Sequence, residues 1–131
     1  MTSSIPSVIL IRRAIQNWSF MGKSQRTKGS SFERWVANQL KSVFPEAKRH
    51  LEFQTQEARG VDLDNTGPFA IQCKAYAKYP PITKIQEVQL REGEIPVLVC
   101  KGDRLTPMAV LPFDEFVRLL ERAGYGKNQN K

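Results

Sequence analysis

The sequence is poor in the residues that build disulfide frameworks and zinc sites. It has two cysteines, Cys73 and Cys100, and one histidine, His50, in 131 residues. Both cysteines lie in apolar, strand-like runs, so we expect small buried side chains in a reducing compartment. No zinc site is expected. The apolar run at residues 8–11 is too short to span a bilayer, so no membrane association is predicted.

Acidic residues are also scarce: 13 Asp and Glu stand against 20 Lys and Arg, a net charge of +7. This balance favours an anionic partner, although many small basic proteins bind nothing in particular. Residues 1–29 contain five basic residues and no acid. We expect an extension upstream of an internal start at Met21, together with a flexible basic arm that contacts phosphates; an organelle-targeting segment is the alternative. One domain, residues 30–124, and a disordered tail, residues 125–131, complete the chain.

Helical periodicity is clear after the extension. Apolar residues recur at helical spacing from residue 32 to residue 44, which predicts a helix that begins at Ser30 or Ser31 and ends at Pro45. Glu33 lies in the first turn of this helix. Its carboxylate has two alternative roles: it closes a capping box with Ser30, or it reaches across to the next strands as a metal ligand.

Two apolar strands follow, each with polar side chains on one face. Asp62 lies in the first, residues 60–64, and Gln72 and Lys74 share a face of the second, residues 69–76. The residues between the strands favour a turn, so a β-hairpin is predicted. An odd number of loop residues would place Asp62 beside Gln72, whereas an even number would not.

The polar side chains of this hairpin need a compensating partner, because an uncompensated charge on a central strand is costly. A bound metal ion is one such partner. Asp62 and the amide oxygen of Gln72 would then be ligands, and Lys74 would position the attacking water.

The remaining elements are predicted from apolar runs and turn residues. Further strands are expected at residues 47–53, 95–100 and 108–111, a crossover helix from residue 82 up to residue 93, and a last helix from 112 to 124. The last helix is expected to bury Phe113, Phe116, Val117 and Leu120. The fold class is therefore α/β, in the order α-β-β-β-α-β-β-α, with a mixed five-stranded sheet flanked by helices. The strands on either side of the crossover are expected to be parallel.

A helix acid, then an Asp near a hairpin, then a residue-x-Lys triplet ten residues later resembles the PD-(D/E)XK (restriction-endonuclease-like) nuclease superfamily. Within it, residues 28–34, 60–63 and 69–74 are similar to archaeal-type Holliday junction resolvases and their phage relatives. The likeness covers about residues 22–122.

The resemblance implies a homodimeric endonuclease with a restriction-endonuclease-like core, which cuts four-way or other branched DNA in recombination and repair. It implies Mg²⁺ as cofactor, with Mn²⁺ as a substitute, and the cytoplasm of a prokaryote or phage-infected cell as location. Carried over by position, the catalytic residues are Glu33, Asp62, Gln72 and Lys74, and the first three of these are also the metal ligands.

Two residues depart from the family pattern. Val61 stands where the motif has proline, which contributes backbone shape rather than chemistry. Gln72 stands where Glu or Asp is usual, which removes one negative charge and is expected to weaken metal binding. Two alternatives therefore stay open: a nicking or restriction-type nuclease acting on duplex DNA, and a catalytically weakened DNA-binding module on the same fold.

Basic residues around these motifs are expected to hold backbone phosphates without reading sequence. Arg34 also matches a basic residue beside the helix acid in the family. The predicted DNA contacts are Arg26, Lys28, Arg34, Arg59, Lys78 and Lys84.

Overall fold

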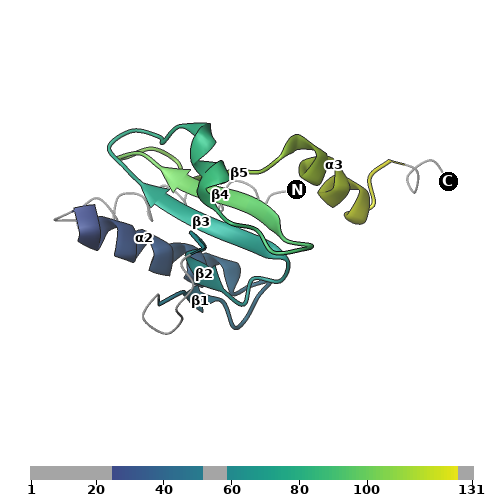
Figure 1. Ribbon diagram of the computed structural model, residues 1–131, viewed down its shortest axis with the longest axis horizontal. Coiled ribbons are helices and arrows are strands. Elements are labelled where there is room, and N and C mark those ends of the chain that lie inside the picture. The colour runs from purple at the N-terminus through teal and green to yellow at the C-terminus, as the bar shows by residue number, and fades with distance from the viewer. Residues whose placement is uncertain (1–24, 52–58, 127–131) are drawn as a thin grey trace, which may run out of the picture.

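The computed structural model describes residues 25–51 and 59–126, with side chains described from Lys28 onward. The predicted basic extension or targeting segment (residues 1–24) and most of the predicted tail (residues 127–131) lie outside this part. The elements are α2 (Gln25–Leu40), β1 (Lys48–Arg49), β2 (Leu63–Asp64), β3 (Phe69–Ala75), the 3₁₀ helix η2 (Ile82–Glu87), β4 (Ile95–Lys101), β5 (Met108–Val110) and α3 (Phe113–Arg122). The fold is thus mixed α/β (Figure 1).

The described strands form two sheets, not the single five-stranded sheet that the sequence predicts. β1 pairs antiparallel with β2, and the second sheet has the order β3-β4-β5. β3 and β4 run parallel, with Gln72 opposite Leu98, so the prediction of parallel strands around the crossover is confirmed. β5 runs antiparallel to β4.

The predicted hairpin ladder between β2 and β3 is not formed. A backbone hydrogen bond from Asp62 N to Ile71 O, 2.8 Å long, does link the two segments. The Cys73 N–H, however, donates to the Asp62 side chain instead of a carbonyl. A ladder requires backbone partners on both strands, so this side-chain acceptor interrupts it at Cys73.

The core lies between α2 and one face of β3. Ile71, Cys73 and Ala75 are buried on this face, which confirms the alternation seen in the sequence. They pack against the buried residues Phe32, Val36, Ala37 and Leu63. Figure 1 shows α2 and η2 on opposite sides of β3 and β4. The opposite face of β3, with Gln72 and Lys74, is therefore turned toward η2.

The bounds of α2 differ from those predicted. α2 begins at Gln25 rather than at Ser30 or Ser31, and it ends at Leu40, before the turns that lead to Pro45. The additional N-terminal turn carries Lys28, whose ammonium group pairs with the Asp103 carboxylate after β4. This long-range contact extends the helix beyond what its apolar periodicity shows.

The crossover is a six-residue 3₁₀ helix instead of the helix predicted up to residue 93. Pro80 and Pro81 precede it, and the backbone is extended again at Val88, with φ −78° and ψ 131°. Val88 is buried, whereas Ile82 is 67% exposed. The crossover thus contributes to the core at its end rather than along a helical face.

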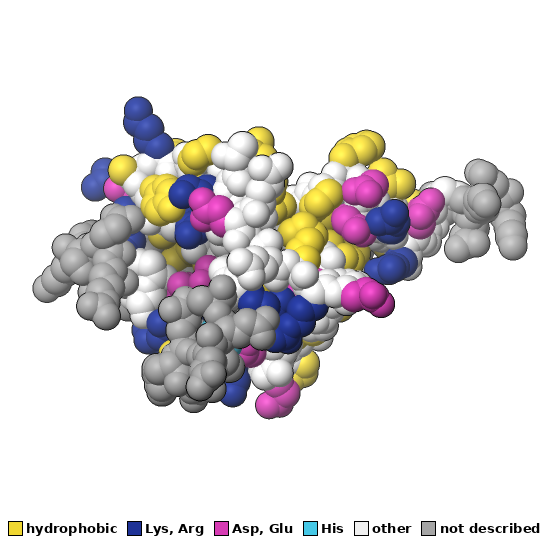
Figure 2. All heavy atoms as spheres, viewed as in Figure 1, with side chains coloured by type: hydrophobic (Ala, Val, Ile, Leu, Met, Phe, Trp, Pro, Cys, Tyr) yellow, Lys and Arg dark blue, Asp and Glu magenta, His cyan; other side chains and the backbone are white. Residues whose placement is uncertain are grey.

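α3 forms close to its predicted bounds, but its expected burial is wrong. The apolar residues of the helix are exposed: Phe113, Phe116, Val117 and Leu120. Figure 1 shows α3 beyond the end of β5 and apart from the sheet, and Figure 2 shows hydrophobic side chains gathered over it. The apolar face of α3 therefore does not pack into the core that the described residues form.

Among the helices in residues 25–51 and 59–126, none has the length and hydropathy needed to cross a membrane.

Candidate active site on β3

The candidate site is centred on Cys73 in the middle of β3. Strand alternation turns Cys73 toward α2 and turns Gln72 and Lys74 to the opposite face. Gln72 is only 2% exposed, whereas the Lys74 side chain is 27% exposed. The site therefore has a buried amide next to an ammonium group that solvent reaches.

Asp62 meets this strand at its edge. Its Oδ2 accepts a hydrogen bond of 2.7 Å from the Cys73 N–H. Four residues, 65–68, separate β2 from β3, an even number, and the Asp62 carboxylate lies against the strand backbone rather than opposite Gln72. Because a strand N–H points within the plane of its sheet, the carboxylate lies at the strand edge between Gln72 and Lys74.

Glu33 is engaged by a basic residue that the sequence analysis did not single out. The Arg49 side chain on β1 donates from Nε to Glu33 Oε1 over 3.1 Å. Because α2 begins at Gln25, Ser30 is inside the helix and the capping box expected there is wrong. The metal-ligand role of Glu33 remains a prediction, and its carboxylate already has a partner.

The Cys73 thiol shows that these charges converge. Burial raises the pKa of Cys73 well above its usual value, and the carboxylates of Asp62 and Glu33 raise it further, while Lys74 lowers it. Two carboxylates and one ammonium group thus lie within electrostatic reach of a single sulfur atom. The thiol stays protonated, so Cys73 contributes packing rather than a nucleophile.

Gln72 has one satisfied end and one unsatisfied end. Its Nε2 faces Oε1 of Glu87, at the end of η2, over 3.5 Å. Its Oε1 is buried and accepts no hydrogen bond from any described residue. The reversed amide would place its oxygen against the Glu87 carboxylate, so the observed orientation is favoured. An acceptor without a donor therefore lies inside the site.

Glu87 is a second residue that the sequence analysis missed. Its Oε1 lies 3.9 Å from Lys74 Nζ, and its Oε2 lies 3.0 Å from Lys84 Nζ. The hydrogen bond from Lys84 is the main cause of the lowered pKa of Glu87. The spacing of Glu87 and Lys84 was visible in the sequence, but the approach of η2 to β3 was not.

The donor set of the site was compared with the needs of Mg²⁺. In the described ranges, no three side chains of Asp, Glu, His or Cys converge closely enough to hold a metal ion. The site does offer oxygen donors of the kind that Mg²⁺ and Mn²⁺ prefer: the Asp62 carboxylate and the unsatisfied Gln72 amide oxygen. These two residues fit the role of ligands in chemical type, whereas Glu33 is held by Arg49.

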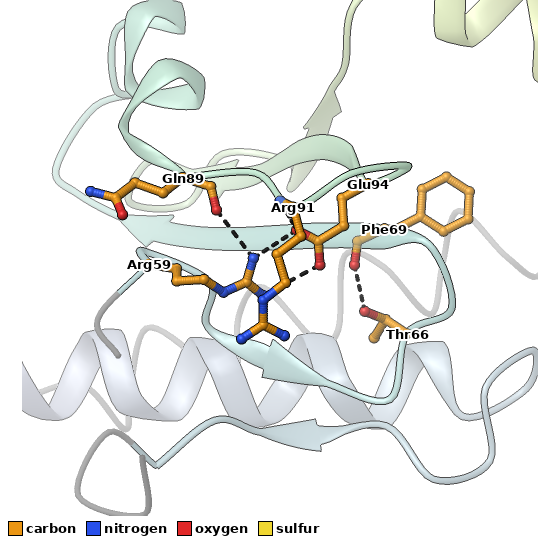
Figure 3. Close-up of polar contacts among 6 residues, drawn as sticks. All are labelled: Arg59, Thr66, Phe69, Gln89, Arg91 and Glu94. Carbon is orange, nitrogen blue, oxygen red and sulfur yellow. Dashed lines mark hydrogen bonds and ion pairs between the residues drawn. The ribbon is translucent and has the colours of Figure 1, made fainter. Parts of the chain in front are cut away.

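Arg59, a predicted phosphate contact, is tied to the loop before β4 (Figure 3). Its guanidinium donates to both carboxylate oxygens of Glu94, over 2.7 and 3.3 Å, and to Gln89 O over 3.1 Å. The Gln89 N–H donates back to Arg59 O. Arg59 therefore joins two segments of the fold, and its contact with phosphate remains a prediction.

The other predicted phosphate contacts have different surroundings. Lys28 and Lys84 form ion pairs with acids, whereas Arg34 and Lys78 are exposed and form no ion pair with any residue the structure describes. Arg26 lies in the first turn of α2, and its side chain lies outside the described part. Of these residues, Arg34 and Lys78 have the charge most accessible to DNA.

Comparison of the chain with protein-family models, curated protein sequences and solved structures finds no match in any of the three.

Proposed function

We propose that the protein is a metal-dependent endonuclease that hydrolyses phosphodiester bonds in branched DNA, as a Holliday junction resolvase does. The observation that carries the proposal is the contact of the Asp62 carboxylate with the Cys73 N–H. It brings the acid that precedes β2 to the residue between Gln72 and Lys74 on β3. The same three residues were selected from the sequence by their resemblance to a nuclease motif.

In this mechanism Mg²⁺ or Mn²⁺ supplies Lewis-acid polarisation of the phosphate and lowers the pKa of a bound water. Asp62 and Gln72 would hold the cation through their side-chain oxygen atoms. The Cys73 N–H fixes the Asp62 carboxylate, so one of its oxygens is oriented without further loss of rotamer freedom. Lys74 orients the attacking water and offsets the charge that develops on the phosphate as the new P–O bond forms and the old one breaks.

Accessible basic residues provide the DNA contacts in this proposal. Arg34 and Lys78 bind backbone phosphates, and the net charge of +7 adds long-range attraction. Because such contacts release counterions, the affinity for DNA is expected to fall steeply with salt and to depend little on sequence. The proposed location is the cytoplasm of a prokaryotic or phage-infected cell.

The proposal includes a homodimer formed through α3. Two copies related by a twofold axis would bring two active sites to one four-way junction. The exposed apolar side chains of α3 offer a surface for this contact. Antiparallel packing of two such helices would place the acidic first turn, with Asp114 and Glu115, near the basic last turn, with Arg122.

The test is cleavage of a labelled four-way junction and of a linear duplex of the same sequence, each with Mg²⁺ and with EDTA. Asp62→Asn keeps an acceptor oxygen for the Cys73 N–H but removes the charge, and Lys74→Ala removes the ammonium group. Each is expected to lower the cleavage rate by at least about 100-fold, with junction affinity changed less than about threefold. Lys41→Ala, at an exposed lysine after α2, is the matched control.

Each alternative function has its own outcome in this assay. Equal cutting of the linear duplex would indicate a nicking or restriction-type enzyme. Tight binding of the junction without cleavage under any divalent metal would indicate a binding module. The neutral Gln72 favours that module, since it leaves one charge fewer in the site. Wild-type cleavage rates in Asp62→Asn would show that the site is assigned to the wrong residues.

A further inference from the structure

We propose that Glu87 is the second carboxylate of the cation site and replaces the acid that position 72 lacks. This inference rests on the nuclease function proposed above and names a ligand that the resemblance does not supply. It is carried by the surroundings of Gln72, where a buried amide contacts one carboxylate and leaves its own oxygen unsatisfied.

The buried oxygen of Gln72 is the first part of the argument. Leaving a buried acceptor without a partner is costly, unless a ligand supplies the missing interaction. Gln72 is only 2% exposed, and its Oε1 has no hydrogen-bond partner among the described residues. A cation, or a water bound to one, would satisfy this oxygen, and a cation between the two side chains would favour the reversed amide, with Oε1 turned toward the Glu87 carboxylate.

The position of the Glu87 carboxylate is the second part. Its Oε1 lies 3.5 Å from Gln72 Nε2 and 3.9 Å from Lys74 Nζ. An acid at position 72 would neighbour Lys74 on the same face of the strand, two residues away. Glu87 approaches these two side chains from η2, and therefore brings its negative charge to the place where the strand itself has none.

The third part is the backbone that holds Glu87 in place. Gly60, with φ +82°, lies so close to the end of η2 that a Cβ there would be 3.2 Å from Glu87 O. The hydrogen bonds between Arg59 and Gln89 fix the same crossing. The segment that leads to Asp62 and the segment that ends in Glu87 are thus packed together, so both acids are positioned by one contact.

The experiment measures Mn²⁺ affinity of the free protein by electron paramagnetic resonance, without DNA. Glu87→Gln is expected to weaken Mn²⁺ binding roughly tenfold, and Gln72→Glu to strengthen it. The double variant Gln72→Glu/Glu87→Gln moves the charge from η2 to β3 and is expected to bind within about threefold of wild type. Glu92→Gln makes the same chemical change at an exposed acid on the loop before β4 and serves as the matched control.

The outcomes separate this inference from the proposed function. If wild type and Glu87→Gln bind Mn²⁺ equally, Glu87 is an ion-pair partner of Lys74 and Lys84 only, and the roles of Asp62 and Lys74 are unaffected. If wild type binds no Mn²⁺, the cation site is wrong and so is the role of Glu87. Failure of the double variant to recover affinity, while its thermal unfolding matches wild type, would also overturn the inference.

Discussion

Lys101 is the least typical charged residue of the described fold. It ends β4 and is only 1% exposed. Its pKa is lowered from 10.5 to about 8, mainly by burial and also by the neighbouring charge of Lys28, while Asp103 raises it. The ion pair of Lys28 with Asp103 thus lies beside a lysine whose charged form is disfavoured by the fold.

We expect Lys101→Met to stabilise the protein near neutral pH, by an amount that decreases as the pH rises. Between pH 8 and 10.5 the unfolded chain binds the proton of Lys101 more tightly than the folded chain. Wild-type stability therefore rises with pH in this window, by up to about 1.4 kcal/mol per pH unit. Urea unfolding of both proteins at several pH values measures the difference, with Lys78→Met, at an exposed lysine, as control. A difference independent of pH would contradict this cause.

The site residues were predictable from the sequence only where strand alternation determines them. The pattern of β3 correctly places Gln72 and Lys74 on one face and Cys73 on the other. The partners Arg49 and Glu87 were not predictable, because each comes from an element that meets the site only after folding. An isolated Glu or Arg in a sequence carries no signal of such a contact.

The segment before β2 and the segment before β4 are held together by the pair of Arg59 and Glu94. The guanidinium hydrogen bonds are the main cause of the lowered pKa of Glu94, and the Arg91 N–H, 2.7 Å from Glu94 Oε1, lowers it as well. Both side chains are partly buried, with 13% and 22% exposed. The pair is therefore less screened than a surface ion pair.

We expect Glu94→Gln to lower the free energy of unfolding by about 1 kcal/mol at pH 7. A carboxylate with a lowered pKa contributes stability above its unfolded-state value of 4.5, and this contribution is lost as the pH falls through the folded-state value. The advantage of wild type over Glu94→Gln is thus expected to vanish in acid. Thermal unfolding from pH 3 to pH 7 tests this, and Glu92→Gln is expected to match wild type throughout.

Secondary structure was predictable where a single periodicity dominates. The apolar alternation of β3 and the continuous apolar run of β4 give bounds within one residue of those observed. The short strands β1 and β2 and the 3₁₀ helix η2 were overextended. Just before β2, the Asp62 carboxylate accepts the Cys73 N–H of β3, and two prolines precede η2. A periodicity of apolar residues records neither effect.

At the scale of the whole molecule, α3 does not pack as its pattern suggests. An amphipathic helix has the same sequence signature whether its apolar face meets its own sheet or another chain. Here that face is exposed, with Phe113 at 76% and Phe116 at 45% (Figure 2). The described sheet therefore leaves the apolar face of α3 uncovered. A second copy of the chain is the partner proposed above for this face.

We expect Phe116→Glu to convert a dimer into a monomer, because it places a charge within the proposed apolar contact between two α3 helices. Analytical ultracentrifugation over a range of concentrations measures the change. The unfolding temperature of the monomer is expected to be nearly that of Val43→Glu, a control at another exposed apolar residue, since neither site is buried within one chain.

The antiparallel arrangement of the two α3 helices leads to a further prediction. Asp114→Arg and Arg122→Glu are each expected to weaken the dimer, and the double variant to restore it. A wild-type chain that stays monomeric at all concentrations would remove α3 as a dimer surface.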